Sequence, residues 1–194
     1  MKRLLGALAL RLFRTRVVGS PPADPVYVLV CAPHTSNWDL VLMLAIAWTS
    51  DIHPVWMGKK EMFDGPLGWL FHRLGGLAVD REDPAGIVDE IVDAARVRDH
   101  MALVIPPEGT RKSGTHWKSG FRRIAAAADI PMVLAFVGGP DNTCGFGPRL
   151  EVTDDLVADM DILRAFYADK KGFRPSRATP PLLREESKSE STPG

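Results

Sequence analysis

A histidine and an aspartate, His34 and Asp39, lie five residues apart in a short polar stretch between two apolar runs. A histidine with a pKa near neutrality can take a proton from a hydroxyl group, and a carboxylate at its other ring nitrogen orients it and stabilises the imidazolium. Such a pair suits a reaction in which a hydroxyl group loses its proton as it attacks. On one helix this spacing points the side chains to different faces, so they meet only if His34 lies in the turn before a helix and Asp39 in its first turn.

The flanking sequence predicts that arrangement. Residues 26–32 are apolar, rich in β-branched side chains and preceded by prolines, which indicates a buried strand. Residues 40–48 indicate a helix, with Ser36 as its N-cap and Asp39 three positions later. The pair would then lie at a strand-to-helix turn, where α/β proteins place their chemistry. A capping box at the same residues is the alternative, because it explains Asp39 without catalysis.

Three further motifs follow in order: residues 76–81 (GLAVDR), residues 108–111 (EGTR) and residues 130–133 (IPMV). Together with the His-x-x-x-x-Asp spacing, they resemble the four sequence blocks of the glycerolipid acyltransferases, the relatives of the lysophosphatidic acid acyltransferases. The resemblance covers roughly residues 26–137. Two departures leave the charged residues untouched: Pro33 stands where many members have Asn, and Ala78-Val79 stands where an aromatic residue or isoleucine is usual.

The resemblance implies direct transfer of an acyl group from a thioester to the hydroxyl of a lysophospholipid-like acceptor such as lysophosphatidic acid. His34 would be the general base and Asp39 the residue that orients it. The donor would be acyl-CoA or acyl carrier protein. No enzyme-bound nucleophile, metal or other cofactor is expected.

A phosphorylated acceptor needs fixed positive charge, which arginine supplies through a planar guanidinium group that binds phosphate with two donors. Salt bridges are the alternative for these arginines, Arg81 with Glu82 or Asp83 and Arg111 with Glu108. Glu108 would hydrogen-bond either acceptor hydroxyls or nearby backbone. The predicted substrate-binding residues are Lys59, Arg81, Glu108, Gly109, Thr110 and Arg111.

Two other classes of protein stay open at this point. A thioesterase or lipid hydrolase would use Ser36 or Cys31 as a nucleophile beside His34, although the sequence lacks a Gly-x-Ser-x-Gly elbow. A non-catalytic membrane-binding protein would keep the fold and use only its basic N-terminal segment. In that case the change His34→Ala would leave the function intact.

The whole chain indicates one α/β domain of 194 residues, 45% of them hydrophobic. Strands alternate with helices, which predicts a largely parallel central sheet with helices on both faces and an N-terminal amphipathic helix. The formal net charge of zero argues against a nucleic-acid binder. The two cysteines have no metal or redox spacing, as expected for a reduced, intracellular protein. We expect the acyltransferase domain to span residues 19–172.

The two ends of the chain carry separate predictions. Residues 1–18 are basic and lack acidic residues, and Leu5, Leu8 and Leu12 fall on one face of a helix. This pattern predicts a helix on an anionic membrane surface, with packing on the core as the alternative. No run approaches the roughly 20 apolar residues of a spanning helix. We therefore expect a cytoplasmic protein, peripheral on the inner face of the cell membrane. Residues 138–148 are predicted to be a loop and residues 173–194 a disordered tail.

Overall fold

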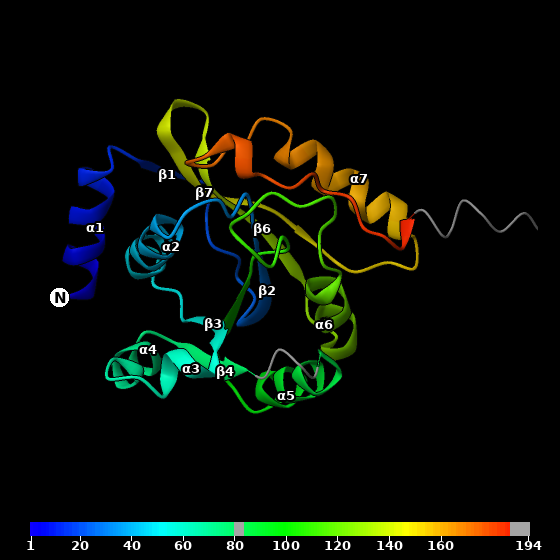
Figure 1. The fold of residues 1–194 in the computed structure, drawn as a ribbon, viewed down its shortest axis with the longest axis horizontal. Coiled ribbons are helices and arrows are strands. Elements are labelled where there is room, and N and C mark those ends of the chain that lie inside the picture. Colours follow the sequence, from blue (N-terminus) through cyan, green and yellow to red (C-terminus); the bar gives the residue numbers. More distant parts are fainter. Residues whose placement is uncertain (80–83, 187–194) are drawn as a thin grey trace, which may run out of the picture.

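Apolar strands form the centre of the molecule, and helices alternate with them along the chain (Figure 1). The computed structural model describes residues 1–79 and 84–186. The elements in chain order are α1 (Lys2–Leu12), β1 (Arg16–Val18), β2 (Val26–Cys31), α2 (Trp38–Thr49), β3 (Pro54–Lys59), α3 (Lys60–Phe63), α4 (Gly68–Arg73), β4 (Gly76–Val79), α5 (Pro84–Arg96), β5 (Met101–Ile105), α6 (Gly120–Ala128), β6 (Met132–Gly139), β7 (Thr143–Leu150) and α7 (Leu156–Tyr167). Two short 3-10 turns span Pro140–Asn142 and Pro175–Arg177.

The seven described strands form one sheet in the order β1-β7-β6-β2-β5-β3-β4. The pair β6 and β7 is antiparallel, and the other neighbouring pairs in the described sheet are parallel. Helices α1 to α4 lie on one side of the sheet and α5 to α7 on the other (Figure 1). The predicted α/β class, with a largely parallel sheet covered on both faces, is confirmed.

The strand β2 shows why its sequence is apolar throughout. Tyr27 and Leu29 pack in the cluster on the α2 side, whereas Val28 and Val30 pack in the cluster with α5, α6 and α7. All four side chains are buried. A strand that is covered on both faces cannot alternate apolar with polar residues, so its sequence is a continuous apolar run.

The predicted loop over residues 138–148 is wrong, because most of it belongs to the strands β6 and β7. The glycines of this segment allow a close approach of two backbones. A Cβ atom at Gly145, where φ is +143°, would stand 2.0 Å from the carbonyl oxygen of Val18 in β1. Glycine therefore marks the contact between β1 and β7 rather than a break in the chain.

The N-terminal helix is shorter than predicted, because α1 ends at Leu12 and Arg16–Val18 pair with β7 as a strand. It also packs on the core, since a Cβ atom at Gly6 would lie 2.8 Å from the carbonyl oxygen of Ala45 in α2. The opposite face stays open to solvent, with Leu4 76% and Leu8 54% exposed. In the described part of the chain, none of the helices has the length and hydropathy needed to cross a bilayer.

The C-terminal segment corrects another prediction. Residues 173–186, which the sequence predicts to be disordered, pack against the domain, with Thr179 4% and Leu183 1% exposed. Leu183 joins the main core cluster and pairs with Trp117 in an isolated β-bridge. An apolar anchor and backbone hydrogen bonds thus hold a segment whose proline-rich composition is typical of disorder. The rest of the predicted tail lies outside the described residues.

Candidate active site

The turns that follow β2 and β5 lie side by side at the carboxyl edge of the sheet. The two strands are neighbours in parallel register, with Val30 opposite Ile105, so the residues just beyond them converge. His34 follows β2 and Glu108 follows β5. Lys59 ends β3, the next strand along the same edge. The edge carries the side chains whose chemistry the sequence singles out.

His34 and Asp39 meet across the turn between β2 and α2, with His34 before the helix and Asp39 in its first turn. The Nδ1 atom of His34 is 3.0 Å from Oδ2 of Asp39, and the two side chains are 20% and 7% exposed. With Nδ1 turned to the carboxylate, Nε2 is the ring nitrogen that is left for a substrate. A carboxylate that accepts Nδ1–H leaves the Nε2 lone pair free, which is the tautomer of a general base.

The Asp39 carboxylate also holds the backbone of the turn. Its Oδ2 atom accepts the N–H groups of Thr35 at 2.8 Å and Ser36 at 2.9 Å. The predicted N-cap is wrong by one residue, because α2 starts at Trp38 with Asn37 as its N-cap. The capping interaction and the bond to the imidazole therefore share one oxygen, and the two interpretations of Asp39 are compatible.

Glu108 supports the same turn from the neighbouring strand. Its carboxylate is buried and accepts the backbone N–H of His34 through Oε2 and that of Thr179 through Oε1, the latter at 3.4 Å. Burial raises the pKa of Glu108 to about 7, although the two backbone hydrogen bonds and His34 favour the charged form. The sequence predicts that Glu108 hydrogen-bonds either acceptor hydroxyls or nearby backbone. Its described hydrogen bonds are to backbone N–H groups.

Residues Gly109, Thr110 and Arg111 form an exposed turn beyond Glu108. Gly109 donates its N–H to the Pro106 carbonyl at 3.1 Å. Its φ of +66° is the reason for a glycine here. In the described residues no ion pair joins Arg111 to Glu108. Lys59 is exposed as well. Arg81 lies outside the described residues.

The two candidate nucleophiles have unfavourable surroundings. Burial, with a smaller contribution from Asp39, raises the pKa of the Cys31 thiol to about 12, so the thiolate is disfavoured. Ser36 is buried and its Oγ accepts the N–H of Trp38 at 3.3 Å. In addition, the described residues contain no group of three or more His, Cys, Asp or Glu side chains arranged for a metal ion.

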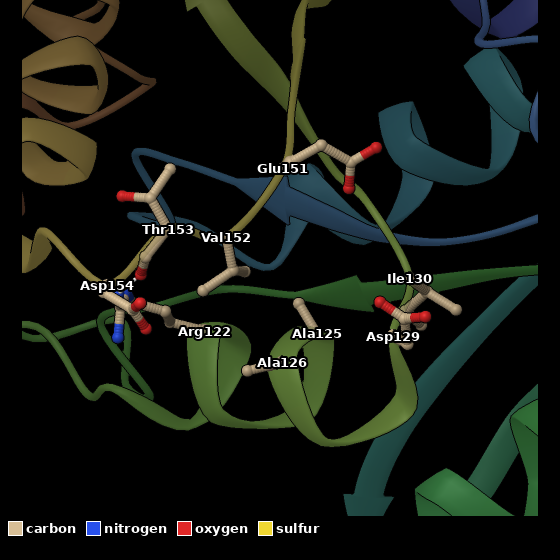
Figure 2. A pocket seen from close by; sticks show the side chains of 9 residues that line it. All are labelled: Arg122, Ala125, Ala126, Asp129, Ile130, Glu151, Val152, Thr153 and Asp154. Atoms are coloured by element: carbon tan, nitrogen blue, oxygen red, sulfur yellow. Dashed lines mark hydrogen bonds between the residues drawn. The ribbon is translucent and has the colours of Figure 1, made fainter.

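A polar cavity of about 270 Å³ lies elsewhere, between α6 and the segment that follows β7 (Figure 2). Ile130 in its wall precedes β6, so the cavity lies at the opposite end of the sheet from His34. Arg122, which projects from α6, is already bound to Asp159, with Nε 3.0 Å from Oδ2. The arginine of this cavity therefore serves an internal ion pair, and the candidate site stays at the carboxyl edge.

Sequence reasoning missed Thr179, whose backbone holds Glu108 from a segment 71 residues further along the chain. It lies in a stretch of prolines and charged residues without helical or strand periodicity. No local signal marks such a residue, because its contact depends on how the chain returns to the site.

Known acyltransferases are similar to this chain in sequence. Residues 15–136 match the family model described as Acyltransferase. The 1-acyl-sn-glycerol-3-phosphate acyltransferase of Cocos nucifera is 32% identical over 129 residues, 63% of this chain and 41% of that protein. The protein of the same name from Limnanthes alba is 30% identical over 100 residues, 48% of this chain and 36% of that protein. The chain thus spans less than half the length of these curated relatives.

The crystal structure of the 1-acyl-sn-glycerophosphate (LPA) acyltransferase PlsC from Thermotoga maritima has the same fold. Its TM-score is 0.60 at 14% identity, and the match covers 98% of this chain and 80% of that one. The family model covers more than half of the chain, and the four sequence blocks lie within the matched region. The chain therefore belongs to the acyltransferase family, among the glycerolipid acyltransferases that its motifs resemble.

Proposed function

We propose that this protein is an O-acyltransferase that moves an acyl group from a thioester to the hydroxyl of lysophosphatidic acid or a closely similar lysophospholipid. The observation that carries the proposal is the pairing of His34 Nδ1 with Asp39 Oδ2 at 3.0 Å, at a strand-to-helix turn and with a fifth of the histidine side chain exposed. Relatives that match this chain are named for acyl transfer to 1-acyl-sn-glycerol-3-phosphate, which supports the acceptor.

In the proposed reaction, Nε2 of His34 takes the proton of the acceptor hydroxyl as its oxygen attacks the thioester carbonyl carbon. Asp39 keeps Nδ1–H hydrogen-bonded and stabilises the imidazolium that forms. When the tetrahedral intermediate collapses, the new C–O bond stays, the C–S bond breaks and the thiolate takes the proton from Nε2. The acyl group passes directly between the two substrates, so no covalent enzyme intermediate, metal or cofactor takes part.

The acceptor phosphate would bind at the exposed turn beyond Glu108. Arg111 lies three residues after Glu108, whose carboxylate accepts the backbone N–H of His34, so a phosphate on Arg111 would hold the acceptor within reach of the base. Its planar guanidinium suits a phosphate better than a point charge does. Lys59 lies at the same edge of the sheet, and the family's blocks add Arg81, Gly109 and Thr110 to the proposed acceptor site.

Both the donor and the acceptor carry acyl chains, and the proposed place of reaction is a membrane surface. Helix α1 exposes Leu4, Leu5, Leu8 and Leu12 on a segment that is basic and has no acidic residue in its first turn. An apolar face flanked by cations binds anionic bilayers. We propose a peripheral position on the inner face of the cell membrane.

Leu8→Ser should weaken sedimentation with anionic vesicles about fivefold, given the apolar area that it removes. Val97→Ser, a change at another exposed apolar residue, should leave it unaltered.

The experiment that tests the proposed function measures free thiol released from acyl-CoA, with and without lysophosphatidic acid. We expect release that depends on the acceptor and matches the phosphatidic acid formed. Equal release without acceptor would overturn the proposal in favour of a hydrolase. If acyl-CoA gives no release, the same measurement is made with acyl carrier protein as the donor. Turnover that is absent with both donors, or that does not depend on lysophosphatidic acid, would reject acyl transfer to this acceptor.

A further inference from the structure

The loop that carries Arg111 has no regular secondary structure, and its two ends are held together. The N–H of Lys118 donates to the carbonyl of Pro107 at 2.7 Å, which closes the loop on itself. Between these residues, Gly109 to Thr115 are exposed. An exposed loop without helical or strand hydrogen bonds depends on contacts at its base for a fixed conformation.

Thr179 supplies those contacts from the C-terminal segment, and it uses three different groups to do so. Its N–H donates to Oε1 of Glu108 at 3.4 Å, its Oγ1 accepts the N–H of Gly114 at 2.9 Å, and its carbonyl accepts the Trp117 Nε1–H at 2.9 Å. Glu108 begins the loop, whereas Gly114 and Trp117 end it. One buried threonine therefore joins both ends of the loop.

The same C-terminal segment also reaches the turn that holds the base. The N–H of Arg174 donates to Oγ1 of Thr35 at 3.1 Å. Gly172 packs so closely on Thr35 that a Cβ atom would stand 2.9 Å from this Oγ1. Further along, the Trp117 N–H donates to the Leu182 carbonyl at 2.8 Å, and Leu183 is buried in the core. The segment is anchored on both sides of Thr179.

We propose that Thr179 is a positioning residue for acyl transfer, which holds the Arg111 loop against the His34 turn so that a bound phosphate and the base keep a fixed separation. This inference rests on the proposed function. Thr179 touches no substrate in this account and acts through Glu108, Gly114 and Trp117. Because it positions the phosphate-binding loop, its loss should weaken acceptor binding more than it slows turnover of bound substrates.

The experiment uses Thr179→Val in the full chain, which keeps the backbone N–H and the shape of the side chain but removes the acceptor for Gly114. We expect the KM for lysophosphatidic acid to rise about 3- to 10-fold, the effect of one lost hydrogen bond, with kcat changed less than about twofold. Thr179→Ser keeps the hydroxyl and should restore the wild-type KM. Thr49→Val is the control, because it removes a partly buried, hydrogen-bonded threonine hydroxyl from the far end of α2.

A double mutant separates positioning from general loss of stability. If Thr179 acts through the loop, Arg111→Ala should hide most of the effect of Thr179→Val on KM, so that the two effects do not add. Full additivity, or a KM for Thr179→Val equal to that of Thr49→Val at equal Tm, would overturn the inference. Should Thr179→Val fail to fold, Trp117→Phe removes the Nε1–H bond to Thr179, keeps a ring in the core and should raise the same KM.

Hydrogen exchange of the protein without substrate gives a readout that does not need activity. In Thr179→Val, the amide of Gly114, which loses its acceptor, should exchange about tenfold faster than in wild type, while the amides of β2 and β5 keep their protection. Unchanged exchange in this loop would overturn the inference even for an active enzyme. A wild-type protein without acceptor-dependent thiol release would instead reject the proposed function, so the two failures are distinguishable.

Discussion

Two buried aspartates occupy matching positions at opposite ends of the sheet. Asp39 lies in the first turn of α2 and Asp159 in the first turn of α7, and each is 5% exposed. Each also reaches back to a backbone N–H before its helix. Asp39 accepts from Thr35 and Ser36, and Asp159 accepts from Thr153 at 3.2 Å. By burial and local structure the two carboxylates are alike.

Their partners differ in what they can do with a proton. Asp159 binds Arg122 and also accepts the Thr153 hydroxyl at 2.8 Å, so both its oxygens are used and its cation stays charged. Asp39 binds an imidazole, which can take up and release a proton through the nitrogen that faces away from the carboxylate. Burial and hydrogen bonding alone therefore do not distinguish a catalytic carboxylate from a structural one, whereas the chemistry of the partner does.

The largest expected contrast is in activity. Asp39→Asn should lower kcat/KM about 10²- to 10⁴-fold, because the amide no longer stabilises the imidazolium or fixes its tautomer. Asp159→Asn should leave kcat/KM per folded molecule within about twofold, the range expected for a residue outside the chemistry. Steady-state kinetics of both variants, corrected for folded fraction by circular dichroism, would make this comparison. Equal losses of activity in the two variants would break it.

The reverse contrast is in stability. Asp159→Ala leaves Arg122 without its ion-pair partner, and we expect it to lower the free energy of unfolding by about 3 kcal/mol. Asp39→Ala removes a carboxylate that accepts two backbone N–H groups and should cost only about 1 to 2 kcal/mol, the usual cost of a lost helix cap. Urea unfolding of both proteins tests the order. A larger loss for Asp39→Ala would show that the histidine turn is the more important structural site.

Glu108 is a third buried carboxylate, and its contribution to stability should depend on pH. Its folded pKa of about 7 lies above its ordinary 4.5, so its contribution to stability is present at acid pH and is lost as pH rises through 7. Between pH 5 and 8 the wild type should lose about 2 kcal/mol relative to Glu108→Gln, because one pKa unit corresponds to about 1.4 kcal/mol. Urea unfolding at the two pH values measures this difference, and a constant difference would contradict the raised pKa.

The smallest expected effects concern the hydroxyl groups beside each aspartate. Ser36→Ala removes one side-chain hydrogen bond, with the N–H of Trp38. Thr153→Val removes the bond to Asp159 and two bonds to the backbone of Asp155, and because Thr153 is exposed the latter contribute little. Each change should therefore lower the free energy of unfolding by about 1 kcal/mol. Both should keep kcat/KM within a few-fold of wild type. Thermal unfolding and thiol release test the pair. If Ser36→Ala abolished turnover, Ser36 would be a nucleophile. Ser36 and Thr153 would then differ in function, although each lies beside a buried aspartate.

The sequence was sufficient for features that depend on local pattern. The apolar run of residues 26–32 predicted the central strand β2, and the five-residue spacing of His34 and Asp39 predicted that they meet only across a turn. The predicted loop at residues 138–148 failed because glycine marks a close backbone approach there as well as a turn. The site's support by Thr179 was beyond prediction, because it joins residues 71 positions apart.

Acceptor-dependent thiol release by His34→Ala tests whether His34 is the general base. His100→Ala, a change at an exposed histidine, is the control. Removal of a general base should slow release at least about 100-fold in His34→Ala, with Tm close to wild type, and His100→Ala should retain the wild-type rate. A folded His34→Ala protein that releases thiol at the wild-type rate, dependent on lysophosphatidic acid, would show that His34 is not the base.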